Sequence, residues 1–563
     1  MEVTGSQLIA KTLKAMGVEY VFGVPGGQLV LLLDALEKHG IKFIHTRHEQ
    51  AAAHMADAYY RLTGKVALAI GTVGPGAADL VPGVYEAWSE SSALVAITAQ
   101  NQRWRIYPDT GGAQGADHFK MFEGITKWRA VVWDIRRIPQ LVSTAVRVAQ
   151  SGHPRPVMLD FPSDILFGKI DLEEITDFPD LKDADKLVPP APDAGAVAEV
   201  AEIMKKHQKM AIHAGGGVLK ASAVDLLREL AEKYHIPVVP SLTARGVFPE
   251  SHPLCFLPLS YGGMSALGEA EVVLVLGARL TAMDLWGKPP MWKEDQILIQ
   301  VDTDPESLAL NRRVKMAIQS HIRKFLQALL EALEGSPPWQ NPDLESYREA
   351  QESWQAEFQQ MAREDSLPLH PLRAVKEICS FIKDDDLVVL DGGNTQVWAN
   401  YLIRRNKPYR FLAQNNSGML GGGLPKAITA AMLHPQERVF FLTGDGAFMF
   451  NVQELETIAR LGLDNLLIFV FNDRAYGMIA AAEEGLERVG VDFYDIKHHK
   501  LMEAIEGHGK RVQSPRELRA GIDEALKRGG VHLLDVIVDR QANLRPPDLE
   551  TLEAIWMEGI DVF

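Results

Sequence analysis

The stretch that decides the fold is "LTGDGAFMFNVQELETIARLGLDNLLIFVFNDRAYGMI", residues 442–479. Its two apolar runs are typical of buried β-strands, and Asp445 comes just after the first while Asn472 comes just after the second. If the strands are adjacent and parallel, both polar residues lie at the carboxyl edge of a sheet, where ligands bind in open α/β folds. Between the strands, apolar residues at helical spacing predict one face of a helix, formed by Val452, Leu455, Ile458 and Ala459.

The residue types at this edge suit a metal ion and a diphosphate. A carboxylate, a side-chain amide and neighbouring backbone carbonyls are hard oxygen ligands, which suit Mg²⁺ that also holds a diphosphate. Gly444 and Gly446 let the backbone approach phosphate groups closely. A polar turn after a strand would explain "GDG" by itself. The asparagine after a second apolar strand favours the binding site instead.

The rest of the chain alternates strands and helical stretches in the same way. Strands are predicted at "KFIHT", "VALAIGT", "ALVAITA" and "PVMLDFP", then at "KMAIHAGGG", "IPVVPSL", "VVLVLGA" and "ILIQVD", and finally at "LVVLDGG", "RVFFLTGDG", "NLLIFVFND" and "HLLDVIVD". Helical patterns between strands favour parallel sheets. We therefore predict an α/β protein of three consecutive doubly wound parallel-sheet domains, residues 1–172, 190–335 and 365–545, with a tail at 546–563.

Composition and charge argue against several classes of partner. The net charge is -16, from 58 basic and 74 acidic residues, so no basic surplus exists to neutralise nucleic acid or an anionic membrane. No run of about 18 apolar residues predicts a membrane span. Cys255 and Cys379 stand far apart and form no metal-ligand or redox pair. We expect a small-molecule substrate and, with no signal-peptide pattern, a cytoplasmic setting.

A second motif, "IHTRHEQAAAHMADAYYRLTGK" at residues 44–65, places Glu49 where a strand runs into an alanine-rich helix. A negative charge in the first helical turn favours the helix dipole by about 0.3–1 kcal/mol, which is the simplest explanation. A catalytic acid is the alternative. An apolar surround disfavours the charged carboxylate and raises its pKa, so that the group can donate or accept a proton.

Together these motifs resemble the thiamine diphosphate (ThDP) enzymes, in which "GDG" followed by "ND" or "NN" is the diphosphate–metal motif. The similarity to the acetolactate synthase-like branch covers nearly the whole chain. It is carried, in the same order, by "RHEQAAAHMADAYYRLTGK", "GTVGPGAADLVPGVYEAW", "HAGGGVLKAS", "SGMLGGGLPKAITAAM" and "GDGAFMFNVQELETIARLGL". The branch includes acetolactate synthases, benzaldehyde lyase and the 2-hydroxyacyl-CoA lyases. The resemblance implies pyrimidine-binding, middle and diphosphate-binding domains, with ThDP and Mg²⁺ as cofactors.

The resemblance also implies roles for particular residues. Glu49 would be hydrogen-bonded to N1' of the cofactor's aminopyrimidine and promote the imino tautomer, whose nitrogen takes the proton from thiazolium C2. This role favours the catalytic explanation of Glu49. Asp445 and Asn472 would hold Mg²⁺ together with the backbone carbonyl of Arg474.

By the same resemblance, two glutamines are expected to be catalytic. Gln114 in "GGAQGADHF" matches a glutamine that faces the reacting carbonyl in synthases and benzaldehyde lyase, and Gln28 in "GVPGGQLV" matches a position that is histidine in benzaldehyde lyase. Either could also be a surface amide. Leu420 stands where relatives usually carry methionine and would hold the cofactor bent. The remaining positions expected to contact the cofactor are Asn394, Thr395, Gly444, Asp445, Gly446, Ala447, Asn472 and Ile479.

Two further features carry weaker implications. In relatives the middle domain binds FAD or ADP, or nothing. Here Gly215–Gly217 follow a strand, but no acid ends the next strand, so the dinucleotide fingerprint is incomplete and FAD or ADP is not supported. His498 and His499 are unlike the paired-histidine site of pyruvate decarboxylase-type relatives, and we expect them at the surface.

The choice of reaction depends on two departures from acetolactate synthases. Ala482 stands in place of a tryptophan, and Met283 in place of an arginine that would pair with a keto-acid carboxylate. Both changes favour a lyase or carboligase acting on 2-hydroxy ketones or 2-hydroxyacyl thioesters, through a cofactor-bound acyl-anion equivalent. The alternatives are an acetolactate synthase catalytic subunit or 2-oxo acid decarboxylase, and an inactive regulatory or scaffold relative. Intact Glu49, Asp445 and Asn472 disfavour the inactive relative.

The resemblance predicts a homodimer as the minimum assembly and a homotetramer as the expected one. In the family, the acid and the metal-binding domain of one active site come from different chains. The tail after "HLLDVIVD" has an apolar helical face, formed by Leu549, Leu552, Ile555 and Trp556. It is expected either to dock on the third domain or to cover the active site.

Overall fold

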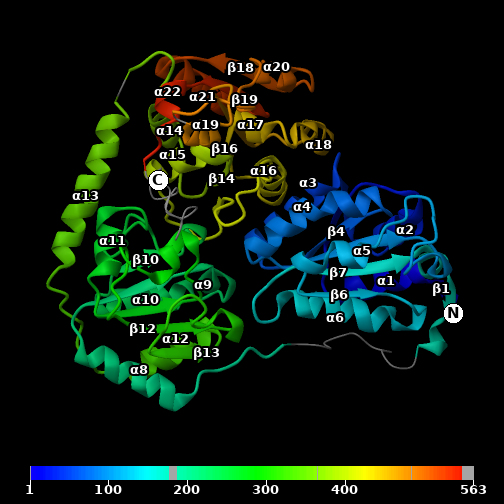
Figure 1. Ribbon diagram of the computed structural model, residues 1–563, viewed down its shortest axis with the longest axis horizontal. Coiled ribbons are helices and arrows are strands. Elements are labelled where there is room, and N and C mark those ends of the chain that lie inside the picture. Colours follow the sequence, from blue (N-terminus) through cyan, green and yellow to red (C-terminus); the bar gives the residue numbers. More distant parts are fainter. Residues whose placement is uncertain (1, 176–186, 364, 484, 548–563) are drawn as a thin grey trace. The chain divides into compact units, whose positions relative to one another are not determined.

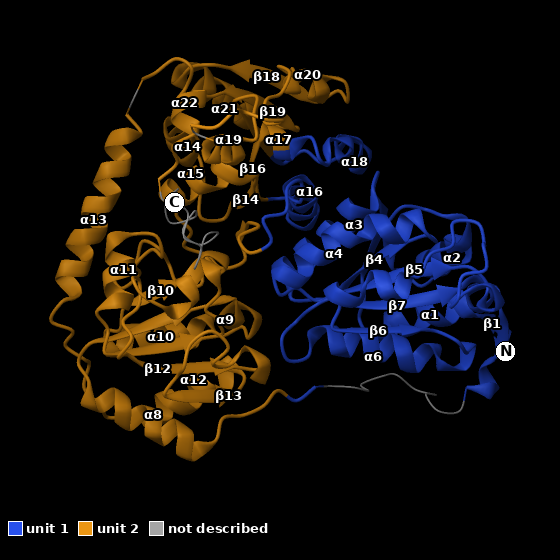
Figure 2. Cartoon of the chain, in the orientation of Figure 1, with its two compact units in different colours: residues 1–188, 417–436, 447–466 blue, residues 189–416, 437–446, 467–563 orange. Residues whose placement is uncertain are grey.

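A computed structural model describes residues 2–175, 187–363, 365–483 and 485–547 (Figure 1). The chain divides into two compact units (Figure 2). The first comprises residues 1–188, 417–436 and 447–466, and the second comprises residues 189–416, 437–446 and 467–563. The predicted tail helix lies outside the described residues.

The first unit is built on a six-stranded parallel sheet of order β3-β2-β4-β5-β7-β6. Its central strands are buried throughout, which explains their continuous apolar runs. The strands are β2 (Tyr20–Gly23), β3 (Lys42–His45), β4 (Ala67–Gly71), β5 (Leu94–Gln100), β6 (Trp128–Val131) and β7 (Val157–Pro162). A separate antiparallel pair joins β1 (Glu2–Thr4) to β8 (Lys169–Asp171).

Helices cover both faces of this sheet, with α3 and α4 on one side and α6 on the other (Figure 1). They are α1 (Gly5–Ala15), α2 (Val30–Lys38), α3 (Glu49–Thr63), α4 (Pro75–Ser89), α5 (His118–Met121), α6 (Ile138–Gln150) and α7 (Ser163–Phe167). Two helices from late in the chain belong to the same unit, α16 (Gly423–Leu433) and α18 (Leu455–Leu461). Helix α16 packs against α3.

A buried ionic cluster fastens α16 to α3 and α4. Lys426 Nζ pairs with Glu86 and lies 3.3 Å from Asp57 Oδ2, and all three side chains are fully buried. His54 Nδ1 contacts the other oxygen of Glu86 at 2.7 Å. Because charges are costly to bury unless they are paired, each member of this cluster depends on the others.

The second unit contains two parallel-sheet domains. The middle sheet has the order β10-β9-β11-β12-β13. Its strands are β9 (Met210–Ala214), β10 (Val238–Pro240), β11 (Val272–Leu276), β12 (Ile297–Asp302) and β13 (Met316–Gln319). Its helices are α8 (Ala194–Lys206), α9 (Gly216–Lys220), α10 (Val224–Tyr234), α11 (Tyr261–Gly268) and α12 (Ile322–Ala332), and α13 (Leu344–Met361) leads to the last domain.

The last sheet has the order β15-β14-β16-β17-β19-β18, so β16 and β17 are neighbours. Its strands are β14 (Leu387–Asp391), β15 (Phe411–Leu412), β16 (Val439–Gly444), β17 (Leu466–Asn472), β18 (His508–Val512) and β19 (His532–Ile537). Its remaining helices are α14 (Pro371–Cys379), α15 (Gly393–Leu402), α17 (Asp445–Phe448), α19 (Gly477–Ala482), α20 (His498–Glu503), α21 (Pro515–Arg528) and α22 (Arg540–Asn543). The predicted fold class of three parallel-sheet α/β domains is confirmed.

The helix predicted between β16 and β17 differs from the structure in detail. A short 3-10 turn at Val452–Glu454 precedes α18. The predicted apolar position Ala459 is exposed, whereas Glu454 is fully buried. Glu454 is satisfied there because its carboxylate accepts hydrogen bonds from the Arg47 backbone N–H (2.9 Å) and the Thr457 hydroxyl (2.6 Å). Glu454, which is not one of the predicted apolar positions, is thus part of the buried face of this segment.

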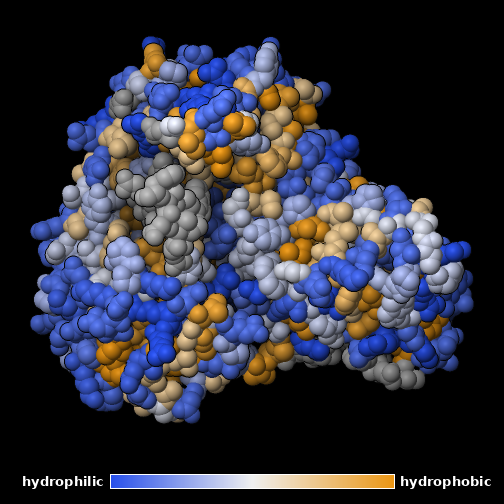
Figure 3. Space-filling model, in the orientation of Figure 1, coloured by the Kyte–Doolittle hydropathy of each residue, from blue (hydrophilic) through white to orange (hydrophobic). Residues whose placement is uncertain are grey.

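The face of the molecule drawn in Figure 3 is mainly hydrophilic, with hydrophobic patches interspersed. Such scattered apolar surface is normal for a folded protein. Among the described residues, no helix combines the length and apolar character needed to cross a bilayer.

Candidate active site

Glu49 is the first residue of α3 and its side chain is buried, with 7% of the residue exposed. His48 caps the helix, because its Nδ1 accepts a hydrogen bond from the Gln50 backbone N–H. Burial raises the pKa of Glu49, and the nearby charge of Asp79 adds to this effect. The environment therefore makes the charged carboxylate less favourable than it is in water, as the sequence predicts for a group that exchanges a proton.

The turn between β4 and α4 brings Glu49 and Gln114 to one place. A Cβ built on Gly76 would come within 2.9 Å of Glu49 Oε1. A Cβ on Gly74 would come within 2.1 Å of the Gln114 carbonyl oxygen. The turn thus holds both residues by close backbone approach, which only glycine allows. The Gln114 side chain itself is exposed.

Gln28 lies against the same turn. Its Oε1 accepts a hydrogen bond from the Thr72 hydroxyl at 2.8 Å. His118 holds the turn in place. Its Nε2 accepts a hydrogen bond from the Gly74 backbone N–H at 3.0 Å, and its Nδ1 lies 3.1 Å from Asp160 Oδ1. Sequence analysis missed His118, because a histidine hydrogen-bonded inside a core has no spacing signature. Gln28, Glu49 and Gln114 therefore surround one turn of the first unit.

His48, Glu49 and Asp79 also lie close enough together to suggest a metal site. The hydrogen bonds argue against one. His48 Nδ1 uses its lone pair to accept from Gln50, so a neutral ring carries its proton on Nε2, the nitrogen that faces Asp79 at 3.8 Å. A protonated ring nitrogen cannot ligate a metal, so this group serves as a helix cap beside the acid.

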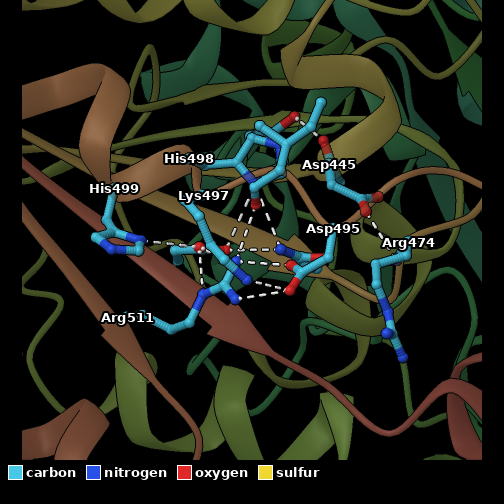
Figure 4. Close-up of polar contacts among 12 residues, drawn as sticks. Asp445, Arg474, Asp495, Lys497, His498, His499 and Arg511 are labelled. Atoms are coloured by element: carbon cyan, nitrogen blue, oxygen red, sulfur yellow. Dashed lines mark hydrogen bonds and ion pairs between the residues drawn. The ribbon is translucent and has the colours of Figure 1, made fainter. Parts of the chain in front are cut away.

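In the second unit, Asp445 and the segment after β17 lie together, as the sequence predicts. Asp445 Oδ2 accepts a hydrogen bond from the Arg474 backbone N–H at 2.8 Å, and Oδ1 accepts from the Gly446 N–H at 2.9 Å (Figure 4). Arg474 has a φ of +61°. The Gly446 amide, which was expected to face a diphosphate, is thus paired with Asp445.

This site has the donor set that a divalent cation requires. Burial and the carboxylate of Asp473 raise the pKa of Asp445 well above its ordinary value. Asn472 Oδ1 is buried and accepts no hydrogen bond from any residue that the structure describes. Two buried carboxylates beside an unsatisfied amide oxygen fit Mg²⁺, because a cation would offset the charge and satisfy the oxygen.

The predicted diphosphate loop forms the start of α15. Asn394 Nδ2 donates to the Asn543 carbonyl at 2.7 Å. Thr395 Oγ1 lies 3.4 Å from the position of a Cβ on Gly444. Helix α15 begins after Gly392, which provides no side-chain cap. Backbone N–H groups at such a helix start suit a phosphate.

The other predicted cofactor contacts are spread over both units. Leu420 is half-buried in the first unit, and the loop that carries it is tied down because Asn451 Nδ2 donates to the Gly421 carbonyl at 2.8 Å. Ala447 is buried there too. In the second unit, Ile479 lies on α19 with 53% of its surface exposed, and its contact with the cofactor stays a prediction.

The surface positions expected for the histidine pair are wrong. His498 is 2% exposed and His499 is half-buried. Both ring Nδ1 atoms approach the buried carboxylate of Asp535, at 3.5 and 3.2 Å respectively (Figure 4). They lie inward because α20 packs against β18 and β19, which places its first residues over that carboxylate.

The glycines of the middle domain have a packing role. A Cβ on Gly215 would come within 2.2 Å of the Gly277 carbonyl oxygen, and one on Gly217 within 2.6 Å of Gly277 Cα. The segments that follow β9 and β11 therefore approach so closely that side chains at positions 215 and 217 would collide with Gly277 or Ala278. Binding of FAD or ADP, which the sequence leaves possible but unsupported, gains no support from these glycine contacts.

This fold and these two sites define a thiamine diphosphate enzyme. Family models of the thiamine pyrophosphate (TPP) enzymes match the chain in three places: the N-terminal TPP-binding domain at residues 3–121, the central domain at 197–329 and the C-terminal TPP-binding domain at 391–536. The chain belongs to the thiamine pyrophosphate enzyme family.

Among curated proteins, the chain is similar to acetolactate synthase large subunits. It is 31% identical to the probable large subunit of Methanococcus aeolicus, over 96% of this chain and 93% of the relative. It is 30% identical to the isozyme 1 large subunit of Escherichia coli K12 (96% and 95% covered) and 31% identical to the isozyme 2 large subunit (97% and 97%). These names favour the acetolactate synthase alternative over the lyase expected from the sequence.

Proposed function

We propose that the protein is a ThDP- and Mg²⁺-dependent carboligase of the acetolactate synthase type, acting on 2-oxo acids. The observation that carries this proposal is the buried Glu49 at the start of α3, in a chain that resembles acetolactate synthase large subunits over nearly its whole length. ThDP, when bound, supplies an acidic thiazolium carbon and an electron sink for making or breaking a carbon–carbon bond.

The role of Glu49 follows from its surroundings. Burial raises its pKa above the ordinary value, which makes proton exchange with a pyrimidine nitrogen easier than it would be for an exposed carboxylate. The neighbouring Ala51, Ala52 and Ala53 are fully buried, and keep the start of α3 apolar. Gly76 leaves space for the carboxyl group without displacing it.

The cation role rests on the last domain. Asp445 and Asn472 offer oxygen atoms at neighbouring strand ends, and the Arg474 carbonyl is the proposed third ligand. An Asp445→Ala variant should therefore lose cation-dependent ThDP binding. Tight, Mg²⁺-dependent ThDP binding by that variant, measured by calorimetry, would contradict the assignment.

A lyase acting on 2-hydroxy ketones or 2-hydroxyacyl thioesters is the second candidate. It is favoured by Met283, which is half-buried, and by Ala482, which is exposed. Neither side chain can pair with the carboxylate of a second 2-oxo acid. A small residue at position 482 also leaves room for a larger substrate.

A product assay separates the candidates. The enzyme with ThDP and Mg²⁺ is incubated with pyruvate alone, with pyruvate and 2-oxobutyrate, with benzoin, and with a 2-hydroxyacyl-CoA, and the products are identified by mass spectrometry. Acetohydroxy acids from the first two mixtures support the synthase. Aldehyde release from the last two, without acetohydroxy acids, supports the lyase and overturns the first proposal.

We also propose that the active form is at least a homodimer and that a homotetramer is its full assembly. The reason is the resemblance, in which the acid and the metal-binding domain of one site belong to different chains. Sedimentation under assay conditions tests this. A fully active monomer would overturn the proposal.

A further inference from the structure

A buried carboxylate lies beside the proposed metal ligand Asn472. Asp535, on β19, is fully buried, and Asn472 ends the neighbouring parallel strand β17. Asn472 Nδ2 donates a hydrogen bond to Asp535 Oδ1 at 2.9 Å. A carboxylate only accepts hydrogen bonds, so the amide nitrogen of Asn472, and not its oxygen, must face Asp535.

The orientation of the amide has a consequence for its oxygen. With Nδ2 held by Asp535, Asn472 Oδ1 points to the other side, where it is buried and accepts no hydrogen bond within the described chain. We propose that Asp535 is a positioning residue that fixes the Asn472 amide with its oxygen toward the divalent cation. The inference rests on the proposed function, because it assumes that Asn472 is a ligand.

Asp535 is itself held in place by its second oxygen. Arg511, which faces it from β18, donates its Nε–H to Asp535 Oδ2 at 2.8 Å, and His499 Nδ1 lies 3.2 Å from the same oxygen (Figure 4). The other edge of the guanidinium pairs with Asp495 at 2.9 and 3.2 Å. The two oxygens of Asp535 thus have different roles, because Oδ1 orients Asn472 while Oδ2 anchors the carboxylate.

A neutral amide at position 535 would no longer fix the orientation of the Asn472 amide. An asparagine side chain can donate or accept, so it would tolerate either orientation of the Asn472 amide. In one of these orientations, Nδ2 of Asn472 would point at the cation. Removing such an outer-shell partner typically costs about 10–100-fold in metal affinity.

The test compares full-length wild type with Asp535→Asn and with Asp495→Asn as the matched control. Asp495→Asn perturbs Arg511 from its far side but leaves the Asp535–Asn472 contact intact. Mg²⁺ is titrated at fixed ThDP, and cofactor binding is followed by calorimetry and tryptophan fluorescence. We expect Asp535→Asn to raise the half-saturating Mg²⁺ concentration about 10–100-fold, and Asp495→Asn to leave it near the wild-type value.

The outcomes are distinguishable. If wild type shows no cation-dependent ThDP binding, the proposed function fails. If wild type binds and folded Asp535→Asn has an unchanged Mg²⁺ half-saturation, this inference fails alone. A purely structural role would lower the melting temperature of the apoprotein without moving the Mg²⁺ half-saturation.

A double variant keeps the test decisive if Asp535→Asn does not fold. Asn472→Asp combined with Asp535→Asn reverses donor and acceptor, and still presents an oxygen to the cation. We expect this variant to bind Mg²⁺ and ThDP more tightly than Asp535→Asn, or close to wild type where the single variant is unstable. A folded double variant with no Mg²⁺-dependent binding would overturn the inference.

Discussion

The carboxyl group of Glu49 lies directly against Gly76, at the first turn of α4. A Cβ at position 76 would come within 2.9 Å of Glu49 Oε1 and 3.0 Å of Thr72 Cγ2. The same helix approaches α3 again at Gly83, where a Cβ would come within 2.6 Å of Ala53 Cβ. Gly76 and Gly83 of α4 therefore allow α3, the helix that begins with Glu49, to pack closely against α4.

The first prediction concerns this contact. Gly76→Ala should displace the Glu49 carboxyl group, and turnover should fall about 10–100-fold because a small misplacement of a reacting group is costly. Steady-state kinetics measures the effect, with ThDP affinity as a second readout. Gly124→Ala is the matched control, since a Cβ at position 124 meets nothing within 4 Å. Equal kinetics in the two variants would contradict the role of this contact.

The second prediction separates proton exchange from binding. Glu49→Gln keeps the size of the side chain but removes its exchangeable acid proton, so ThDP affinity should persist while deprotonation of the cofactor at C2 slows strongly. Quenched hydrogen–deuterium exchange at C2, followed by NMR, measures this rate. An unchanged rate in a variant that still binds ThDP would refute the role assigned to Glu49.

The third prediction concerns acid stability. Burial and Lys426 lower the pKa of His54 from its ordinary value of 6.5 to about 3. Between these values the unfolded chain binds a proton that the folded chain does not. The free energy of unfolding should therefore decrease as pH falls from about 6.5 to 3, by up to about 1.4 kcal/mol per pH unit.

Replacing His54 tests this slope. His54→Gln should flatten the loss of stability in that range, whereas His39→Gln, at a half-buried position of the same unit, should not. The free energy of unfolding is measured by urea unfolding at several pH values, with hydrogen exchange in α3 as the readout. If wild type and His54→Gln lose stability in parallel, His54 does not cause the slope.

The fourth prediction concerns the buried ionic cluster. Lys426→Met leaves Glu86 buried without its cation and leaves Asp57 with Arg61 alone, 3.7 Å away, so the first unit should lose about 3–5 kcal/mol of stability. Lys65→Met is the comparison, because the Lys65–Glu19 pair is largely exposed and should be worth about 1 kcal/mol or less. Hydrogen exchange in α3 and α4 measures the loss of stability in both variants. Similar small losses would mean that the cluster contributes no more than a surface pair.

The sequence predicted the interior strands well and the sheet edges poorly. Each predicted strand is present, but six strands were not predicted: β1 and β8, which form a separate two-stranded pair, and β6, β13, β15 and β18, which lie at the edges of the three large sheets. Edge strands are half-exposed and lack a continuous apolar run; β18, with the sequence "HGKRV", is an example. Interior parallel strands are buried on both faces, which is why apolar runs identify them.

The residues of the candidate site also divide into those that the sequence could predict and those that it could not. Glu49, Asp445 and Asn472 could be predicted as site residues because each stands at a fixed place relative to a strand or helix, and their roles stay predictions. His118, Asp535 and the inward orientation of His498 were not found, because they act through contacts between residues far apart in the chain. For example, 63 residues separate Asn472 from Asp535. No local pattern records such a pair, so only the folded arrangement reveals it.

The cluster around Lys426 also determines when the N-terminal domain can finish folding during synthesis on the ribosome. Glu86 and Lys426 are 340 residues apart, so a ribosome adding about 5–20 residues per second needs about 17–70 s to pass from one to the other. Throughout that interval Glu86 lacks its cation and must keep water around it. The N-terminal domain therefore completes its core only when about three-quarters of the chain exists, and a chain that stops early leaves α3 open to proteases.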